Sequence, residues 1–313
     1  MSSYILSQDG AVLVQGNYTL TTKDISINYF QSKLCVNNAF TGEGMTDIAL
    51  DDVSNLIYTP TLSIDGVTPV IAYFDITSFN RIGELPLPLN TGGIGFRIAI
   101  DNVKNNVMYI IDGGYCIRVL SLIDYSVKGV IMPPSGKLFT DVCINADGTK
   151  LFASTGYYEP PYLISYETKN YNVLNSTILT SAESGSSICF DPLRKLVWTY
   201  VSNGDVSTAF QALDENTLSI QRQFSAASII IFGTRNTLDN TMMYDKDNDI
   251  IIHSNIPYQS ANSQQANIII CSINSVLANA ITTYSIQDSA SFAKSDISKL
   301  FFRIGENSID IYK

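Results

Sequence analysis

Hydrophobic and polar positions along this chain follow a short sequence motif that recurs, which we call the recurring phrase. Each copy has three apolar or small residues and an acid or amide, and turn-forming residues and a second apolar run come next. The copies are Ile48-Ala49-Leu50-Asp51, Ile98-Ala99-Ile100-Asp101, Val142-Cys143-Ile144-Asn145, Ile188-Cys189-Phe190-Asp191 and the looser Met242-Met243-Tyr244-Asp245. Successive copies begin between 44 and 54 residues apart. A repeat of this length, rich in β-branched and aromatic residues, is typical of a β-propeller.

The clearest copy divides into four short apolar runs at residues 96–100, 107–111, 115–122 and 127–132. Runs of about five β-forming residues, separated by Gly, Pro, Asn and Asp, predict antiparallel hairpins. Four strands is also the usual number in one propeller blade. The sequence therefore predicts an all-β chain that forms a single β-propeller domain over residues 1–313.

A second set of acids and amides ends the third run of each copy. Its members are Asp75, Asp124, Glu167, Asp214 and Asn274, and Thr or Ser follows most of them within three residues. Such side chains bond to their own backbone and stabilise a turn. We therefore expect both sets of acids to serve hairpin turns first.

The closing of the last blade depends on the two ends of the chain. After the five repeats, three further strands are predicted at the C-terminus, so the last blade lacks its fourth strand. Propellers commonly complete such a blade with a strand from the N-terminus, which removes an unpaired edge. Residues 4–7 are the natural candidate for this strand, and residues 11–15 are the second choice.

The number of blades depends on the remaining N-terminal runs. Residues 11–15, 25–30 and 34–38 can build one further, irregular blade, which gives seven four-stranded blades in all. If these residues instead decorate the last blade, the count is six. The sequence favours seven and leaves six as the alternative.

Two stretches of the chain carry a resemblance to a known family. Met108-Tyr109-Ile110-Ile111-Asp112-Gly113-Gly114 and the run from Ile117 to Asp124 resemble the YVTN family of propeller repeats. Leu56-Ile57-Tyr58-Thr59-Pro60 and residues 196–203 resemble it more faintly. The YVTN superfamily includes surface-layer proteins, lactonase-like enzymes and amine dehydrogenase subunits. Because the matching residues are structural, the resemblance implies the fold and not an activity.

Composition narrows the classes of partner. Hydrophobic residues make up 45% of the chain and charged residues 15%, so a large core is expected and the surface must be rich in Ser, Thr, Asn and Gln. The net charge of −10 argues against nucleic acid and against anionic membranes. We expect no signal peptide and no transmembrane segment, since the apolar runs, such as residues 229–232, have the length of a strand. The amide- and hydroxyl-rich surface suggests an extracellular or virion location.

The cysteines and the single histidine indicate core residues more than chemistry. None of the cysteines has CxxC spacing, and all are expected to be small buried hydrophobes; they are Cys35, Cys116, Cys143, Cys189 and Cys271. His253 lies in an apolar run and is expected to be a core or edge residue. Its solitude excludes metal sites that need several histidines, and any catalytic triad would have to use it.

Calcium is the one metal that the acids suggest. Residues 245–249 begin like a D-x-D-x-D calcium loop, but Ile250 stands where the loop needs glycine. The repeated acids Asp51, Asp101, Asp191 and Asp245 could also form a ring of carboxylates at a channel mouth. Turn-forming residues follow each of them, so we expect no cofactor and keep calcium as the alternative.

Tyrosines and arginines supply the candidate binding residues. Tyr157, Tyr158 and Tyr162 lie in a loop bounded by Gly and Pro, and tyrosines in such loops suit sugar rings or a protein partner. Ordinary packing over the loop prolines is the alternative for them. Arg97 and Arg235 lie in or just before innermost strands, where each could bind an anion in the axial channel or pair with a neighbouring blade.

These features predict a non-catalytic scaffold that binds a protein or a glycan and that can belong to an oligomeric surface assembly. The competing hypothesis is a calcium-dependent hydrolase of lactonase type with its site at the channel mouth. The chain is expected to be non-enzymatic because it has no dense cluster of His, Asp, Glu and Arg.

Overall fold

The computed structural model describes strands and turns and no helix. Its described residues are 4–6, 12–14, 33–36, 47–62, 69–78, 80–86, 96–156, 160–179, 187–202, 208–225, 241–255, 265–272, 281–287, 292–299, 301–304 and 309–312. In this part of the chain, no helix has the length and apolar character needed to cross a membrane.

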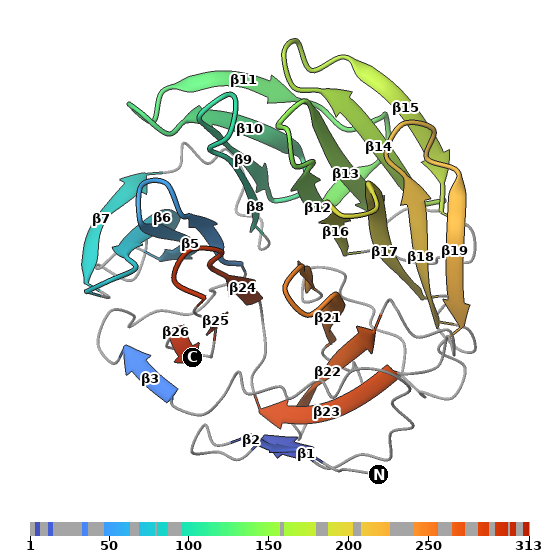
Figure 1. The fold of residues 1–313 in the computed structure, drawn as a ribbon. Helices are drawn as coiled ribbons and strands as arrows, with labels where there is room; N and C mark the ends of the chain where they lie inside the picture. Colours follow the sequence, from blue (N-terminus) through green and yellow to red (C-terminus); the bar gives the residue numbers. More distant parts are fainter. Residues whose placement is uncertain are drawn as a thin grey trace.

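The described strands form six four-stranded antiparallel sheets and one two-stranded ribbon (Figure 1). The first sheet contains β4 (Ala49–Asp51), β5 (Leu56–Leu62), β6 (Pro69–Asp75) and β7 (Arg81–Pro86). The second contains β8 (Phe96–Asp101), β9 (Val107–Asp112), β10 (Cys116–Ser121) and β11 (Val127–Ile131). The third contains β12 (Leu138–Ile144), β13 (Lys150–Gly156), β14 (Tyr162–Glu167) and β15 (Val173–Ile178).

The remaining sheets follow the same order along the chain, except at the end. The fourth contains β16 (Ile188–Asp191), β17 (Leu196–Ser202), β18 (Thr208–Asp214) and β19 (Ile220–Ser225). The fifth contains β20 (Thr241–Asp245), β21 (Ile250–Asn255), β22 (Gln265–Ser272) and β23 (Ile281–Gln287). The sixth contains β24 (Phe292–Lys294), β25 (Phe301–Ile304), β26 (Ile309–Tyr312) and β3 (Lys33–Val36), and the ribbon contains β1 (Tyr4–Leu6) and β2 (Val12–Val14).

The sheets are arranged around a common centre, as the blades of a propeller (Figure 1). The first strand of each sheet is innermost and contacts the first strand of the next, in the order β4, β8, β12, β16, β20 and β24. β24 in turn contacts β4. The predicted all-β propeller is therefore confirmed, and we refer to the sheets as blades 1 to 6.

The last blade is completed by an N-terminal strand, as expected, but not by either of the two strands proposed for that role. β3 pairs with β26 through four residue pairs, with Cys35 opposite Asp310. The two candidate segments contain β1 and β2, which pair with each other, with Tyr4 opposite Val14. Two strands that are close in sequence form a hairpin at low entropic cost, and this pairing leaves the later strand β3 for the last blade.

The described residues contain six four-stranded blades, the lower of the two counts that the sequence allows. The seventh blade that the sequence favours would have used residues 11–15, 25–30 and 34–38. β2 lies in the first of these runs and belongs to the ribbon, whereas β3 lies in the third and belongs to blade 6. Residues 25–30 lie outside the described part of the chain.

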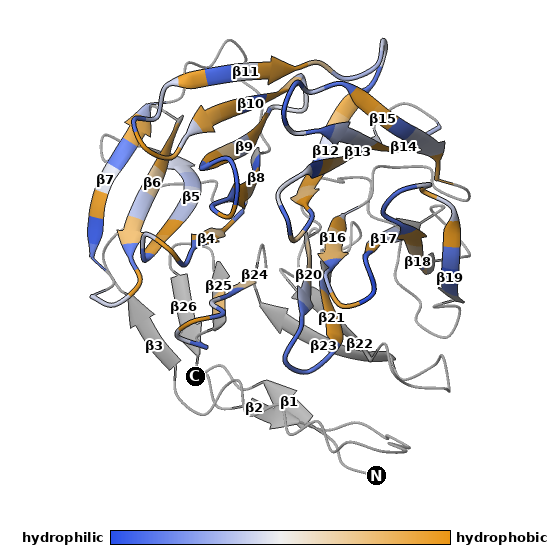
Figure 2. Ribbon diagram, turned by 45° about the horizontal axis from the view of Figure 1, so that its top comes forward, coloured by the Kyte–Doolittle hydropathy of each residue, from blue (hydrophilic) through white to orange (hydrophobic). Residues whose placement is uncertain are grey.

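The core lies between neighbouring blades, where the apolar faces of successive sheets meet. Tyr109 and Ile117 of blade 2, for example, pack against Leu151 and Ile164 of blade 3. Trp198 is fully buried between blades 4 and 5. Figure 2 shows the same division, with hydrophobic colour along the strands and hydrophilic colour on many of the hairpin turns.

The side chains of three cysteines are described, and these three are small core residues. Cys116 and Cys189 are buried, and Cys143 is partly buried; all three are free thiols. Burial raises the pKa of each of these thiols. The side chains of Cys35 and Cys271 lie outside the described part of the structure.

Neighbouring blades are joined at their hairpin turns by side-chain hydrogen bonds. In blade order the donor–acceptor pairs are Asn102 Nδ2 to Asp51 Oδ1 (2.8 Å), Asn105 Nδ2 to Gly148 O (3.0 Å), Lys150 Nζ to Asn216 Oδ1, Arg194 Nη1 to Asp249 Oδ1 (2.7 Å), Lys294 Nζ to Asp245 Oδ1 (2.7 Å) and Ser295 Oγ to Asp52 Oδ1 (2.5 Å). The last of these pairs joins blade 6 to blade 1.

Candidate functional site

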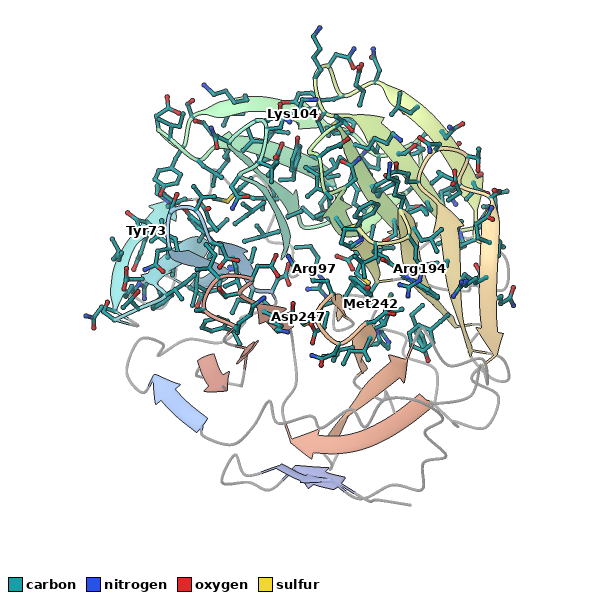
Figure 3. The ribbon with its side chains drawn as sticks, in the orientation of Figure 1. Tyr73, Arg97, Lys104, Arg194, Met242 and Asp247 are labelled. Atoms are coloured by element: carbon teal, nitrogen blue, oxygen red, sulfur yellow. The ribbon has the colours of Figure 1, made fainter. Side chains whose placement is uncertain are left out.

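A row of polar side chains lies at the centre of the molecule, one residue before the recurring phrase. Asp47, Arg97, Asp141 and Ser187 occupy this position in blades 1 to 4, and all four are buried. Figure 3 shows Arg97 near the middle of the ring of strands. Because the innermost strands are in contact, the same sequence position in successive blades brings these side chains together.

Arg97 and the two aspartates link four blades at this centre. The Arg97 Nε atom lies 4.0 Å from the Asp141 Oδ1 atom in the next blade. Asp141 Oδ2 accepts a 2.7 Å hydrogen bond from the Ile188 backbone N–H of blade 4. Asp47 Oδ2 accepts a bond of the same length from the Ile98 N–H of blade 2. The geometry thus shows Arg97 paired with a neighbouring blade, one of the two outcomes that the sequence left open.

The carboxyl group of Asp141 has a strongly raised pKa. Burial raises its pKa to about 7, the Arg97 guanidinium opposes that rise, and the Asp47 carboxylate adds to it. The residue is 7% exposed and Arg97 is 2% exposed. Arg97 and Asp141 therefore contact other buried groups and little solvent. Of the central residues, only Arg97 was identified from the sequence, because the chain has few cations and the other three belong to common residue types.

His253 is a core residue, as the sequence suggested. Its side chain is 0% exposed, and the ring of Tyr200 lies 4.1 Å from its own ring, centroid to centroid. Ser187 Oγ lies 3.5 Å from His253 Nδ1. A Ser–His pair is familiar from nucleophilic catalysis, but that chemistry needs about 2.6–3.2 Å between the two groups and access for a substrate. Here both side chains are enclosed, so the geometry fits packing.

The repeated acids serve the first hairpin turn of their blades. Asp51 Oδ1 accepts the backbone N–H groups of Val53 and Ser54, and Asp101 and Asp191 repeat this arrangement. Asn145 Oδ1 does the same for Thr149 and Lys150. These oxygen atoms are engaged in turns, as the order of residues predicted.

The D-x-D-x-D run is also a turn, with cations from both neighbouring blades around it. Lys294 Nζ lies 2.7 Å from Asp245 Oδ1 and 2.8 Å from Asp247 Oδ2. Arg194 pairs with Asp249 at 2.5 Å. Within the described residues, no group of three or more His, Cys, Asp and Glu side chains could hold a metal ion. No local sequence pattern identifies these partners, because each lies about 50 residues away from the acid that it contacts.

The opposite end of the blades carries the tyrosine loop. Tyr162 is partly buried, its backbone N–H donates to Thr155 Oγ1 at 2.9 Å, and Lys137 Nζ lies 5.4 Å from the centre of its ring. Tyr157 and Tyr158 lie outside the described residues, as does Arg235. Their predicted roles therefore stay predictions.

Two residues that the sequence did not single out lie on the same end of blades 2 and 3. Tyr115 is 51% exposed. Its neighbour Gly114 accepts a 2.8 Å hydrogen bond from the Phe139 N–H, which fixes this loop beside the segment that carries Lys137. The Gly113-Gly114 pair before Tyr115 is the signal that could have identified it, since it bounds a loop as Gly156 does before the tyrosine loop.

Comparison with known proteins supports the fold and goes no further. No protein-family model and no curated protein matches the chain, so nothing beyond the fold supports the YVTN resemblance. Among solved structures, hydrazine synthase of Kuenenia stuttgartiensis is similar over 86% of this chain and 75% of that one, with a TM-score of 0.60 and 12% identity. A nidogen/laminin complex is similar over 77% and 80%, with a TM-score of 0.55 and 10% identity. Both contain β-propellers, and at this identity the likeness concerns the fold alone.

Proposed function

We propose that this chain is a non-catalytic β-propeller scaffold that binds a protein or a glycan through its loop end. The observation that carries the proposal is a contrast in exposure. The groups able to do chemistry, Arg97, Asp141, Ser187 and His253, are buried and contact each other or the core. Tyr115, by contrast, is exposed at the loop end.

The chemistry of the loop end suits recognition. Tyr115, Lys137 and Tyr162 come from two adjacent blades and combine aromatic rings with a cation. Tyrosine rings stack on sugar rings and provide anchors in protein interfaces, where they bury a large area at low entropic cost. Loops on a rigid scaffold are common sites of binding. The amide- and hydroxyl-rich composition favours a place in an extracellular or virion surface assembly.

A binding screen with matched variants tests this proposal. The intact chain should bind members of a glycan array or capture a protein from candidate surface extracts, and the double variant Tyr115→Ala/Tyr162→Ala should bind at least about tenfold more weakly. Val173→Ala, at an exposed residue of the outer strand β15, is the control and should bind like the unchanged chain. Equal binding by the tyrosine variant, or no binding by the unchanged chain, would overturn the proposal.

The competing proposal is a calcium-dependent hydrolase of lactonase type at the channel mouth. This proposal requires that the repeated carboxylates release their turn hydrogen bonds to bind the ion. Among the described residues, no group of acids is arranged to hold a metal ion. Calcium binding to the folded chain would raise its melting temperature by mass action. Melting with calcium and with a chelator therefore separates the two proposals.

A further inference from the structure

The end of the molecule opposite the tyrosine loop carries aliphatic side chains at one repeated position. Because consecutive strands of a blade run antiparallel, the turns after the first and third strands lie at the same end, which we call the turn face. Its first turns are residues 52–55, 102–106, 145–149, 192–195, 246–249 and 295–299. Four of them expose an aliphatic residue two positions after the turn acid or its equivalent: Val53 (74% exposed), Val103 (71%), Leu193 (62%) and Ile297 (72%).

The turns themselves do not require these residues. Aspartates, Asp147 and Asp247, occupy the same position in blades 3 and 5. Turns favour Gly, Pro, Asn, Asp and Ser, and branched aliphatic residues gain nothing there from backbone chemistry. An aliphatic residue in four of six equivalent turns is therefore unexplained by folding.

Three of these residues lie on adjacent blades whose turns are hydrogen-bonded to each other, and we call this row of Ile297, Val53 and Val103 the patch. Ser295 and the Asp296 N–H bond to Asp52, which joins the Ile297 turn to the Val53 turn. Asn102 bonds to Asp51, which joins the Val53 turn to the Val103 turn. Ile123, 80% exposed in the third-to-fourth strand turn of blade 2, extends the patch outward. Exposed aliphatic residues that gather in this way mark interaction sites, whereas scattered ones do not.

The charge of the turn face identifies the occupant. The described turns expose five lysines and four aspartates, which are Lys104, Lys169, Lys195, Lys246, Lys299, Asp124, Asp147, Asp247 and Asp296. The whole chain has 29 acidic and 19 basic residues, with a net charge of −10. Two copies of this acidic chain would repel each other over most of their surface but not across a nearly neutral face that carries both signs.

We propose that the turn face is a docking surface for a second copy of this chain. The two copies meet face to face about a twofold axis, so that the patch of Ile297, Val53 and Val103 packs on its own counterpart. This dimer is independent of binding at the loop end, which stays free in both copies.

Sedimentation velocity over a range of concentrations tests the proposal. The unchanged chain should give twice the monomer mass of 34.4 kDa. The double variant Val53→Glu/Val103→Glu should raise the dissociation constant at least about 100-fold, because like charges would then face each other in the interface. A control with equal added charge, Val130→Glu/Val173→Glu, changes exposed residues on the outer strands β11 and β15 and should dimerise like the unchanged chain.

Three results would overturn the proposal. These are a monomer up to about 100 μM protein, a turn-face variant that dimerises like the unchanged chain, and an outer-strand variant that loses the dimer as completely as the turn-face variant. Equal melting temperatures of the three proteins, measured at a dilution at which all three are monomeric, would show that any difference in dimerisation comes from the interface. Glycan or partner binding by the Tyr115→Ala/Tyr162→Ala variant reports on the loop end alone, so the two proposals fail separately.

Discussion

At the scale of single residues, the turn acids have two roles: they stabilise their own turn, and they help to join neighbouring blades. The sequence predicts the first role and not the second. Asp101 accepts the backbone N–H groups of its own turn and also the Asn105 amide, which in turn reaches Gly148 and Thr168 of the next blade. The local task could be predicted because it depends on residues two to four positions away. The task between blades could not, because it depends on a residue one repeat away and on the register of two sheets.

Gly148 lies where this network leaves no room for a side chain. Its φ is +66°, and an added Cβ would lie 2.6 Å from Asp101 Oδ1 and 2.8 Å from Lys104 Cβ. We expect Gly148→Ala to lower the free energy of unfolding by about 2–4 kcal/mol, from the left-handed backbone together with these contacts. Gly136→Ala is the matched control, since Gly136 has φ +72° with open space around it. It should cost only about 1–2 kcal/mol, and equal losses in urea unfolding would contradict the prediction.

Asp141 should give the stability a recognisable dependence on pH. Its pKa is raised to about 7 by burial, from an ordinary value of about 3.9. Between these two pH values the folded chain holds a proton that the unfolded chain has lost, so this residue makes stability fall as pH rises from about 4 to about 7. Asp141→Asn removes the titration and keeps an oxygen that can accept the Ile188 N–H.

The measurement is the difference in unfolding free energy between the unchanged chain and Asp141→Asn at several pH values. The value for the unchanged chain minus the value for Asp141→Asn should decrease as pH rises from about 4 to about 7 and should then stay constant. The comparison cancels the turn acids, such as Asp147, whose pKa is lowered chiefly by its hydrogen bond with Thr149 and which act in the opposite direction at lower pH. A difference that stays constant from pH 4 to pH 7 would refute the assignment.

At the scale of elements, the strands of the five repeats could be predicted well and the N-terminus could not. The predicted runs at 96–100 and 107–111 correspond to β8 and β9, because hydrophobic alternation and turn residues act locally. The choice between β1, β2 and β3 for the last blade is a competition between distant pairings. Each of the three candidates is short and apolar, so the pattern alone gives no reason to prefer β3.

The pairing of β3 with β26 predicts a specific cross-link. Cys35 is directly opposite Asp310, and opposite residues in an antiparallel pair have Cα atoms about 4.5–5.5 Å apart, within the range of a disulfide. Asp310→Cys should therefore form a disulfide with Cys35 on mild oxidation, seen as a linked peptide by mass spectrometry. Ile311→Cys, opposite Leu34, should form little of this link. A link that forms equally in both variants, or in neither, would show that the register is wrong.

At the scale of the whole molecule, the two ends of the blades differ in the residues that they carry. Side-chain hydrogen bonds join every neighbouring pair of the six described blades at the turns, where the repeated acids lie. The loop end carries the candidate binding residues Tyr115 and Tyr162. The repeated pattern predicts the fold, whereas the candidate binding residues lie in loops whose sequences differ from blade to blade. This is why the sequence predicted the architecture more fully than the site.

The scaffold proposal depends on one claim above all, that the repeated acids hold turns and not a metal ion. The most direct test is the melting temperature of the purified chain in millimolar calcium and in excess chelator. Because the oxygen atoms of Asp51, Asp101 and Asp191 already accept backbone N–H groups, we predict the same melting temperature in both. A melting temperature several degrees higher in calcium would show an ion bound to the folded state and would contradict the account.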